Sequence, residues 1–219
     1  LSCLDWALDG RAPMAPGRGI LLTETRHMHP DICRTLSDRV YDGRLTARPD
    51  AGRQGVSGTP LPAAGAFRVP VLHEGNMRTA TEEVEAIAAT VRQLLQGTWT
   101  DAGGSTRPLG PENTLVAAPG RAQAEAIAAA VPDEVRTGTV ADLKDHPAPV
   151  SLLSMTASTA DDASDGLDAL LSPRLLAGWL GCARGLALVF YSPALATARC
   201  GTLDQLRAAD MLCALPELP

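Results

Sequence analysis

The stretch LALVFY at residues 186–191 is apolar at every position, as expected for a β-strand that is buried on both faces of a sheet. LVAA at residues 115–118 has the same character. Further strands are predicted at residues 20–22, 67–73, 135–140 and 150–155. Because these short strands alternate with amphipathic helices, the sequence predicts parallel strands in a three-layer α/β domain.

The clearest helix is predicted at residues 79–95. Thr79 and Glu82 have the T-x-x-E spacing of a capping box, and Gly97 follows where a helix commonly ends. One face of this segment is apolar at helical spacing (Val84, Ile87, Ala88, Val91, Leu94 and Leu95). Other helices are predicted at residues 1–9, 31–40, 121–131, 167–183 and 202–215, and loops at residues 46–65 and 99–111.

The chain has 219 residues, a formal net charge of −6 and one lysine, Lys144, among its 19 basic residues. Net acidity does not favour a strongly basic nucleic-acid-binding protein, although it leaves room for a local groove lined by arginines.

No apolar run reaches the about 18–20 residues of a membrane helix. Asp5 and Asp9 interrupt the first apolar stretch, so no signal peptide is recognised. The five scattered cysteines favour free thiols, and we expect a cytoplasmic protein with no membrane partner. Because the chain begins with Leu1, we expect it to be part of a longer protein.

Several familiar sites are excluded by their spacing. Lys144 follows no glycine-rich loop, so the chain has no P-loop, and residues 17–19 lack the third glycine of a dinucleotide fingerprint. No serine lies in a G-x-S-x-G turn. His27, His29 and Cys33 do not form a metal site in this interpretation, because alternate residues of an extended segment point to opposite sides.

The segment RHMHPDI at residues 26–32 resembles the Q-Y-R-M-H-P-x-I segment of superfamily 1 helicases, in the branch of the RNA-decay and flap-processing helicases. Residues 114–123, 135–150, 151–160 and 170–191 resemble later segments of the same family in the same order, and residues 192–215 resemble the terminal helix of bacterial members with a fused nuclease-like domain. The resemblance implies that residues 23–215 form the second RecA-like motor domain, an α/β P-loop NTPase fold without its own P-loop. Residues 1–22 would then end the preceding motor region or linker, and residues 216–219 would be a tail.

The resemblance implies ATP-dependent unwinding of, or translocation on, nucleic acid. In such motors ATP and Mg²⁺ bind between two RecA-like domains, of which the first supplies the Walker lysine and the magnesium-binding acid. The second supplies arginines to the γ-phosphate and grips the nucleic-acid backbone. The implied partners are therefore a first motor domain, upstream or on a separate chain, and a single strand of DNA or RNA. No cofactor is expected to bind this chain alone.

The catalytic positions depart from the family pattern. The arginine before M-H-P is replaced by His27, with Arg26 beside it, and the arginine-finger position is Cys182, with only the following arginine retained as Arg184. An arginine finger contributes a factor of about 10³ to 10⁵ to phosphoryl transfer in related NTPases. We therefore expect no catalytic activity from this chain alone.

Nucleic-acid contacts are assigned through the resemblance to Gln123 and Thr139, and Arg121 is added because it is a cation beside the same turn. Three hypotheses remain open: a helicase motor domain that is inactive by itself, a non-catalytic module that binds nucleic acid or protein, and a decayed gene fragment.

Overall fold

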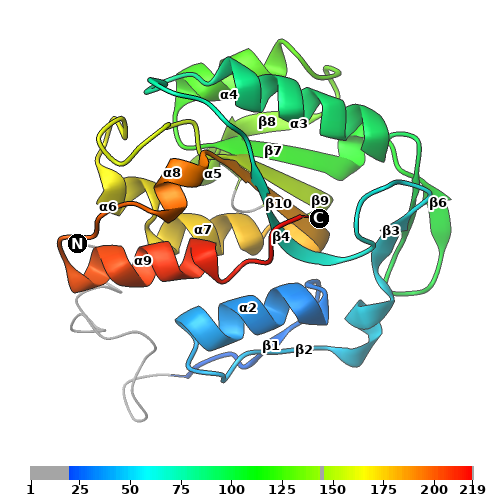
Figure 1. The fold of residues 1–219 in the computed structure, drawn as a ribbon. Helices are drawn as coiled ribbons and strands as arrows, with labels where there is room; N and C mark the ends of the chain where they lie inside the picture. Colours follow the sequence, from blue (N-terminus) through cyan, green and yellow to red (C-terminus); the bar gives the residue numbers. More distant parts are fainter. Residues whose placement is uncertain (1–19, 144–145, 219) are drawn as a thin grey trace.

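A computed structural model describes residues 20–143 and 146–218 (Figure 1). Its centre is a five-stranded sheet in the order β4-β10-β9-β7-β8, and all neighbouring strands are parallel. The strands are β4 (Gly65–Pro70), β7 (Thr114–Ala118), β8 (Arg136–Thr139), β9 (Ala148–Ser154) and β10 (Ala183–Tyr191). The predicted α/β architecture is confirmed at this level. No helix in these two ranges is both long and apolar enough to cross a membrane.

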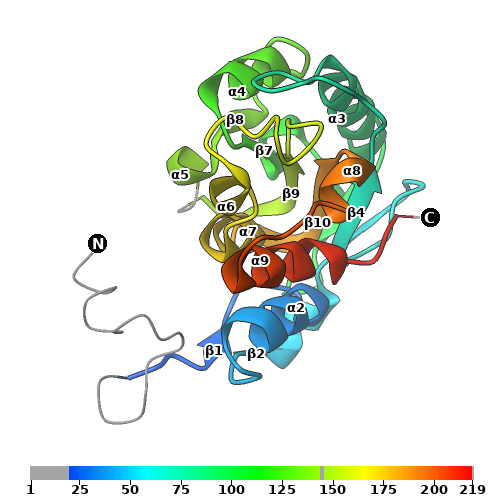
Figure 2. The same ribbon diagram turned by 60° about the vertical axis from the view of Figure 1, so that its left-hand side comes forward.

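Both faces of the sheet are apolar because alternate residues of each strand point to opposite sides. In β10, Leu188 and Phe190 belong to one core cluster, whereas Ala187 and Val189 belong to the other. Helices α3 (Thr81–Leu94) and α4 (Arg121–Ala128) cover the first face (Figure 1). Figure 2 shows α2 (Pro30–Val40), α7 (Pro173–Leu180) and α9 (Leu203–Cys213) on the opposite side. The short helices α5 (Val140–Leu143), α6 (Leu167–Leu170) and α8 (Pro193–Ala196) complete this second layer.

Two small sheets occupy segments that the sequence predicts as loops. An antiparallel sheet joins β3 (Gly55–Ser57), β5 (Thr98–Thr100) and β6 (Thr106–Pro108), and a parallel pair joins β1 (Glu24–Thr25) to β2 (Thr46–Ala47). Single turns of 3-10 helix lie at Pro49–Arg53 and Pro111–Asn113. The loop predictions for residues 46–65 and 99–111 are therefore wrong. Their ordering has a physical cause, since Val56 and Trp99 are buried in the core cluster beneath α3 and α4.

The predicted capping box is also wrong. Helix α3 begins at Thr81, its N-cap is Ala80, and no side chain caps it. Glu82 instead accepts a hydrogen bond from Asn76 Nδ2 at 2.8 Å. Its own backbone N–H and Asn76 both lower the pKa of Glu82. The backbone N–H of Ala80 finds its acceptor in a distant residue, Gln123 Oε1, at 2.8 Å.

The ends of the chain differ from prediction as well. Residues 20–22 form no strand, since Ile20 and Leu22 are exposed and have no sheet to be buried against. The helix predicted at residues 1–9 lies outside the described residues. At the other end, Pro216 and Leu218 exchange backbone hydrogen bonds with Arg68 on the edge strand β4, so this segment covers an edge of the sheet.

The strand order creates a switch point between β7 and β9. From β7 the chain passes through α4 to the neighbouring strand β8. From β9 it passes through α6 and α7 to β10, which lies on the opposite side of the β7–β9 pair, and these two helices cover the opposite face of the sheet from α4. Connections that diverge in this way leave a crevice at the carboxyl ends of the two strands, where open α/β sheets bind ligands. The topology therefore indicates where a site belongs.

Gly185 tests the contact between the small antiparallel sheet and the main sheet. A Cβ atom at position 185 would lie 2.8 Å from Cη2 of the buried Trp99 ring, and closer still to Cζ3. Gly185→Ala is expected to lower the free energy of unfolding by about 1–3 kcal/mol, because the core is overpacked there. Urea denaturation provides the measurement. The control is Gly178→Ala, whose Cβ would meet Val140 at an ordinary 3.5 Å inside helix α7 and should not destabilise the protein. Equal stability of both variants would show that Trp99 is not tightly held.

Candidate functional site

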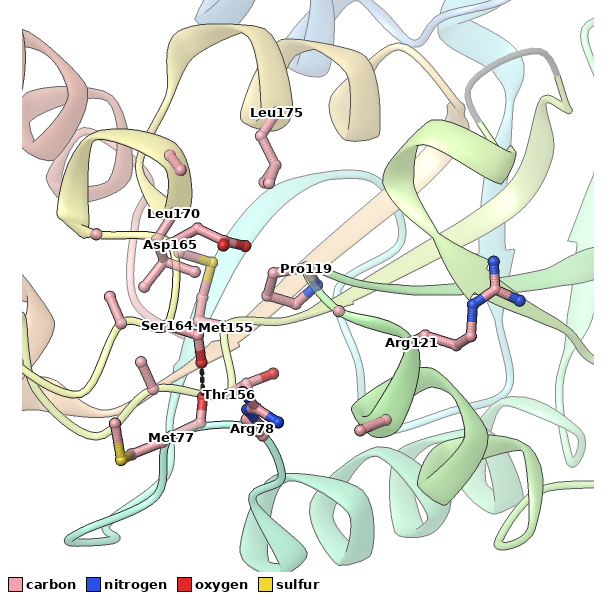
Figure 3. Close-up of a pocket in the computed structure, with 16 residues that line it drawn as sticks. Met77, Arg78, Pro119, Arg121, Met155, Thr156, Ser164, Asp165, Leu170 and Leu175 are labelled. Carbon is pink, nitrogen blue, oxygen red and sulfur yellow. Dashed lines mark hydrogen bonds between the residues drawn. The ribbon is translucent and has the colours of Figure 1, made fainter.

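A cavity of about 420 Å³ lies in the crevice at the carboxyl ends of β7 and β9 (Figure 3). Four segments line it: residues 77–78 before α3, residues 119–122 after β7, residues 155–157 after β9, and residues in 163–175 around α6 and α7. Its volume is within the range of about 300–1,000 Å³ typical of small-molecule and cofactor sites. Position and size both make it the candidate site.

A fully buried polar network supports the floor of this cavity. The Glu83 carboxylate, on α3, accepts hydrogen bonds from the Ser154 hydroxyl at the end of β9 and from the Thr156 backbone N–H at 2.9 Å. His73 Nε2 lies 3.0 Å from the other carboxylate oxygen, and His73 Nδ1 lies 2.7 Å from the Ser158 hydroxyl. Because a carboxylate oxygen accepts, Nε2 donates to Glu83, which leaves Nδ1 to accept the proton of the Ser158 hydroxyl. The Ser158 oxygen also accepts the backbone N–H of Asn76 at 2.8 Å.

Thr156 is held in an unusual backbone conformation. Its φ is +68°, in the left-handed region that a β-branched residue rarely adopts. Its N–H is fixed by Glu83, and its hydroxyl lies 3.2 Å from that of Ser154. Thr156 lines the cavity, so the strained residue is part of the candidate site, as backbone strain often is.

The cations of the site lie at its rim. Arg78 and Arg121 line the cavity and are exposed. Arg121 is also the first residue of α4, whose N-cap Gly120 has no side chain to bind the first free N–H groups of the helix. In Figure 3 the Arg121 guanidinium extends away from the cavity. This direction leads toward Asp142, since Arg121 contributes to lowering the pKa of that carboxyl after the larger effect of hydrogen bonds from Thr139.

The three predicted nucleic-acid contacts have different outcomes. Arg121 lines the cavity and is exposed, and its contact with nucleic acid stays a prediction. Thr139 ends the neighbouring strand β8, outside the cavity lining, and its hydroxyl donates to Asp142 at 2.7 Å. Gln123 is fully buried, with Nε2 donating to Ala80 O and to Ser154 Oγ and with Oε1 accepting from Ala80 N. The prediction that Gln123 contacts nucleic acid is therefore wrong for this fold, because every polar atom of its side chain is already used inside the protein.

The candidate catalytic positions meet at the opposite, amino edge of the sheet. His27 Nε2 donates to the carbonyl of Gly181, 154 residues along the chain, at 2.9 Å. The backbone N–H of His29 donates to the carbonyl of Arg184 at 2.7 Å. The buried Gln54 joins the same two segments by donating to the carbonyl of His27 at 2.7 Å. Segments that are remote in sequence are thereby joined where α7 ends, α2 begins and β10 starts.

Three further side chains at this edge have different environments. Arg26 is exposed, and Arg184 is half-buried with an Nε atom that bonds to no other described residue. Cys182 is 2% exposed, and its thiol lies 3.2 Å from the Gly178 carbonyl and 3.4 Å from the Leu143 carbonyl. The position at which the resemblance predicts an arginine finger is therefore part of the apolar core.

The histidines and cysteine that were considered as metal ligands have other contacts. His27 binds the Gly181 carbonyl, His29 accepts the backbone N–H of Asp31, and the Cys33 thiol lies 3.8 Å from the Leu45 carbonyl. Across the part of the chain that the structure describes, no three side chains of His, Cys, Asp or Glu are grouped as a metal site would require.

His29 makes the start of α2 sensitive to pH. Its Nδ1 caps the helix by accepting the Asp31 N–H at 3.2 Å, and its ring also binds the backbone of Gly52. Burial lowers the pKa of His29 below 6.5, and this effect outweighs the opposing influence of the Asp31 carboxylate. As the pH falls below 6.5, His29 takes up a proton in the unfolded chain before it does so in the folded protein. The free energy of unfolding therefore decreases as the pH falls from 6.5 through the lower pKa that His29 has in the folded protein. Urea midpoints at about pH 7.5 and about pH 5.5 should therefore differ less in His29→Asn, which keeps an uncharged cap, than in the wild-type protein.

If His29→Asn retains the full pH dependence of the wild-type midpoint, another group is responsible. His146→Asn serves as the control because His146 is exposed, and it should leave the dependence unchanged.

Arginine substitutions at Cys182 and His27, where the resemblance predicts arginine, test how deeply each of these two positions is buried. Cys182→Arg places a cation in the core and is expected to reduce stability by at least about 3 kcal/mol. His27→Arg occupies a half-buried position and can still donate to the Gly181 carbonyl, so a change within about 1 kcal/mol is expected. Thermal and urea denaturation measure both. A fully stable Cys182→Arg protein would contradict the burial of this position.

Sequence reasoning missed Glu83, His73, Arg78, Thr156 and Asp165, all of which build or line the site. One signal was available for Glu83. It lies four residues before Ile87, on the apolar face of a predicted amphipathic helix, where an acid needs a buried partner.

A scan against models of protein families finds no match to this chain, and a search of curated proteins finds no significant relative.

Proposed function

We propose that this chain is a RecA-like second motor domain of the superfamily 1 helicase type that binds a single strand of nucleic acid and does not hydrolyse ATP by itself. One observation carries the proposal. The positions that the resemblance places around ATP, near residues 26–29 and 181–184, are in contact in the structure although 154 residues separate His27 from Gly181. The parallel five-stranded sheet with helices on both faces is compatible with such a domain.

The amino edge does not fit ATP on its own. The arginine-finger position is the buried Cys182, and the Nε2 of His27 is used by a backbone carbonyl. Among the positions that the resemblance places around ATP, Arg26 and Arg184 are the cations that the structure describes. In the proposed arrangement, the Walker lysine and the Mg²⁺ ligand belong to a first motor domain, and we derive no ATP step from the residues of this chain.

The carboxyl edge supports the binding of a nucleic-acid strand. Arg78 and Arg121 are exposed cations at the cavity rim, and the first N–H groups of α4 are uncapped beside them. Guanidinium groups and helix N-termini both bind phosphate oxygens. A non-catalytic binding module is therefore the second candidate function, and the burial of Cys182 specifically favours it over an active motor.

Nucleic-acid binding is tested by fluorescence anisotropy with labelled single-stranded oligonucleotides at several salt concentrations. The affinity should fall as salt rises, because bound phosphates release counterions. Arg121→Ala should weaken binding several-fold and reduce the slope of log K against log salt by about 0.7, the value for one phosphate on a single strand. Arg107→Ala, which removes an exposed arginine from the small sheet, should change neither quantity.

The same protein should hydrolyse ATP no faster with nucleic acid than without it. Absence of binding at low salt would overturn the nucleic-acid part of the proposal, and robust hydrolysis stimulated by DNA or RNA would overturn the statement that the chain is inactive.

A further inference from the structure

The interior of the cavity has a different chemistry from its rim. Its walls include the apolar side chains Pro119, Met155, Leu170 and Leu175. Asp165 is the one carboxylate among the described residues that line it; this residue is exposed, as the two arginines are, and Figure 3 shows its carboxylate extending into the space between Leu175 and Pro119. Within residues 20–143 and 146–218, Asp165 has no hydrogen bond or ion pair. The cavity thus offers a free acceptor between apolar surfaces.

This combination disfavours a phosphate group beside Asp165, because a carboxylate repels an anion. The ligand must instead have an apolar body and carry hydrogen-bond donors at one edge. A nucleobase with an exocyclic amino group meets both conditions, since its faces are apolar and carboxylates accept hydrogen bonds from such amino groups.

We infer that the cavity binds a single amino-bearing base of a nucleic-acid strand, guanine above all, with Asp165 as the residue that selects it. The inference rests on the proposed function, because it requires that phosphates of the same strand lie on Arg78 at the cavity and on the Arg121 guanidinium, which extends away from it. Guanine presents two adjacent donors, its N1–H and its N2 amino group, to the two oxygens of one carboxylate. Cytosine and adenine present one amino group, and thymine and uracil present none.

A cationic side chain from a partner protein is a less suitable occupant. Lysine or arginine would pair with Asp165, but Arg78 and Arg121 at the entrance would repel the approaching cation. A cavity lined by two arginines and one carboxylate instead matches a nucleotide, which carries anionic phosphates and a base with amino groups.

The test compares two labelled 12-nucleotide strands by fluorescence anisotropy at one low salt concentration: all thymine, and the same strand with one central guanine. Wild-type protein is expected to bind the guanine-containing strand about fivefold more tightly. Asp165→Asn should bring the ratio to about one, and it should bind the thymine strand at least as well as wild type because a negative charge is removed from the binding face. Asp168→Asn is the matched control, since Asp168 is an exposed acid on α6 outside the cavity lining, and it should retain the preference.

Equal affinity of the wild-type protein for both strands, or a preference that persists in Asp165→Asn, would overturn the inference while leaving salt-dependent binding and the proposed function intact. Failure of every strand to bind at low salt would overturn both. Binding of an arginine-rich peptide that Asp165→Asn abolishes, without any base preference, would assign the cavity to a protein partner and also overturn the inference.

Discussion

The buried carboxylate of Glu83 is the interaction on which the carboxyl edge of the sheet depends. It accepts hydrogen bonds from the Ser154 hydroxyl and the Thr156 N–H, and His73 donates to its second oxygen. Removing the carboxylate would leave buried donors unpaired, at a cost of about 1–3 kcal/mol for each donor. Apolar packing brings α3 onto the sheet, but such packing is non-directional. The directional bonds of Glu83 determine where α3 lies along β9, and they hold Thr156 at the floor of the cavity.

The parallel sheet separates the two sets of candidate residues. A strand of seven residues such as β9 is about 20 Å long, so its two ends carry independent chemistry. At the amino edge, the segments around His27 and Arg184 are joined by backbone carbonyls, and Cys182 is packed into the core. At the carboxyl edge, the strands open into a cavity with cations at its rim. Substitutions at the first edge therefore need not disturb a binding site at the second.

The sequence predicted well those elements whose local pattern of apolar residues by itself indicates which residues are buried. The wholly apolar residues 186–191 lie within β10, and the apolar face of residues 84–94 packs against the sheet as α3. The elements it missed are stabilised by distant partners. The small strand β5 is ordered because the Trp99 ring occupies the space above Gly185, 86 positions along the chain, and no local pattern encodes that contact. Gln123 was placed correctly in the helix that follows β7, but its burial depends on contacts with Ala80 and Ser154.

The amino-acid sequence by itself determined the layers of this protein, because hydrophobic periodicity specifies which residues of each strand and helix must leave water. It also showed which residue types stand at the positions that the helicase resemblance singles out. Only the tertiary structure decided what those residues can do. It buried Cys182 and Gln123, left Arg121 exposed, and placed Asp165 in the lining of a cavity whose apolar walls come in part from remote segments. Exposure and juxtaposition are properties of the packed chain, since they depend on the order of strands in the sheet and on polar contacts between residues far apart in sequence.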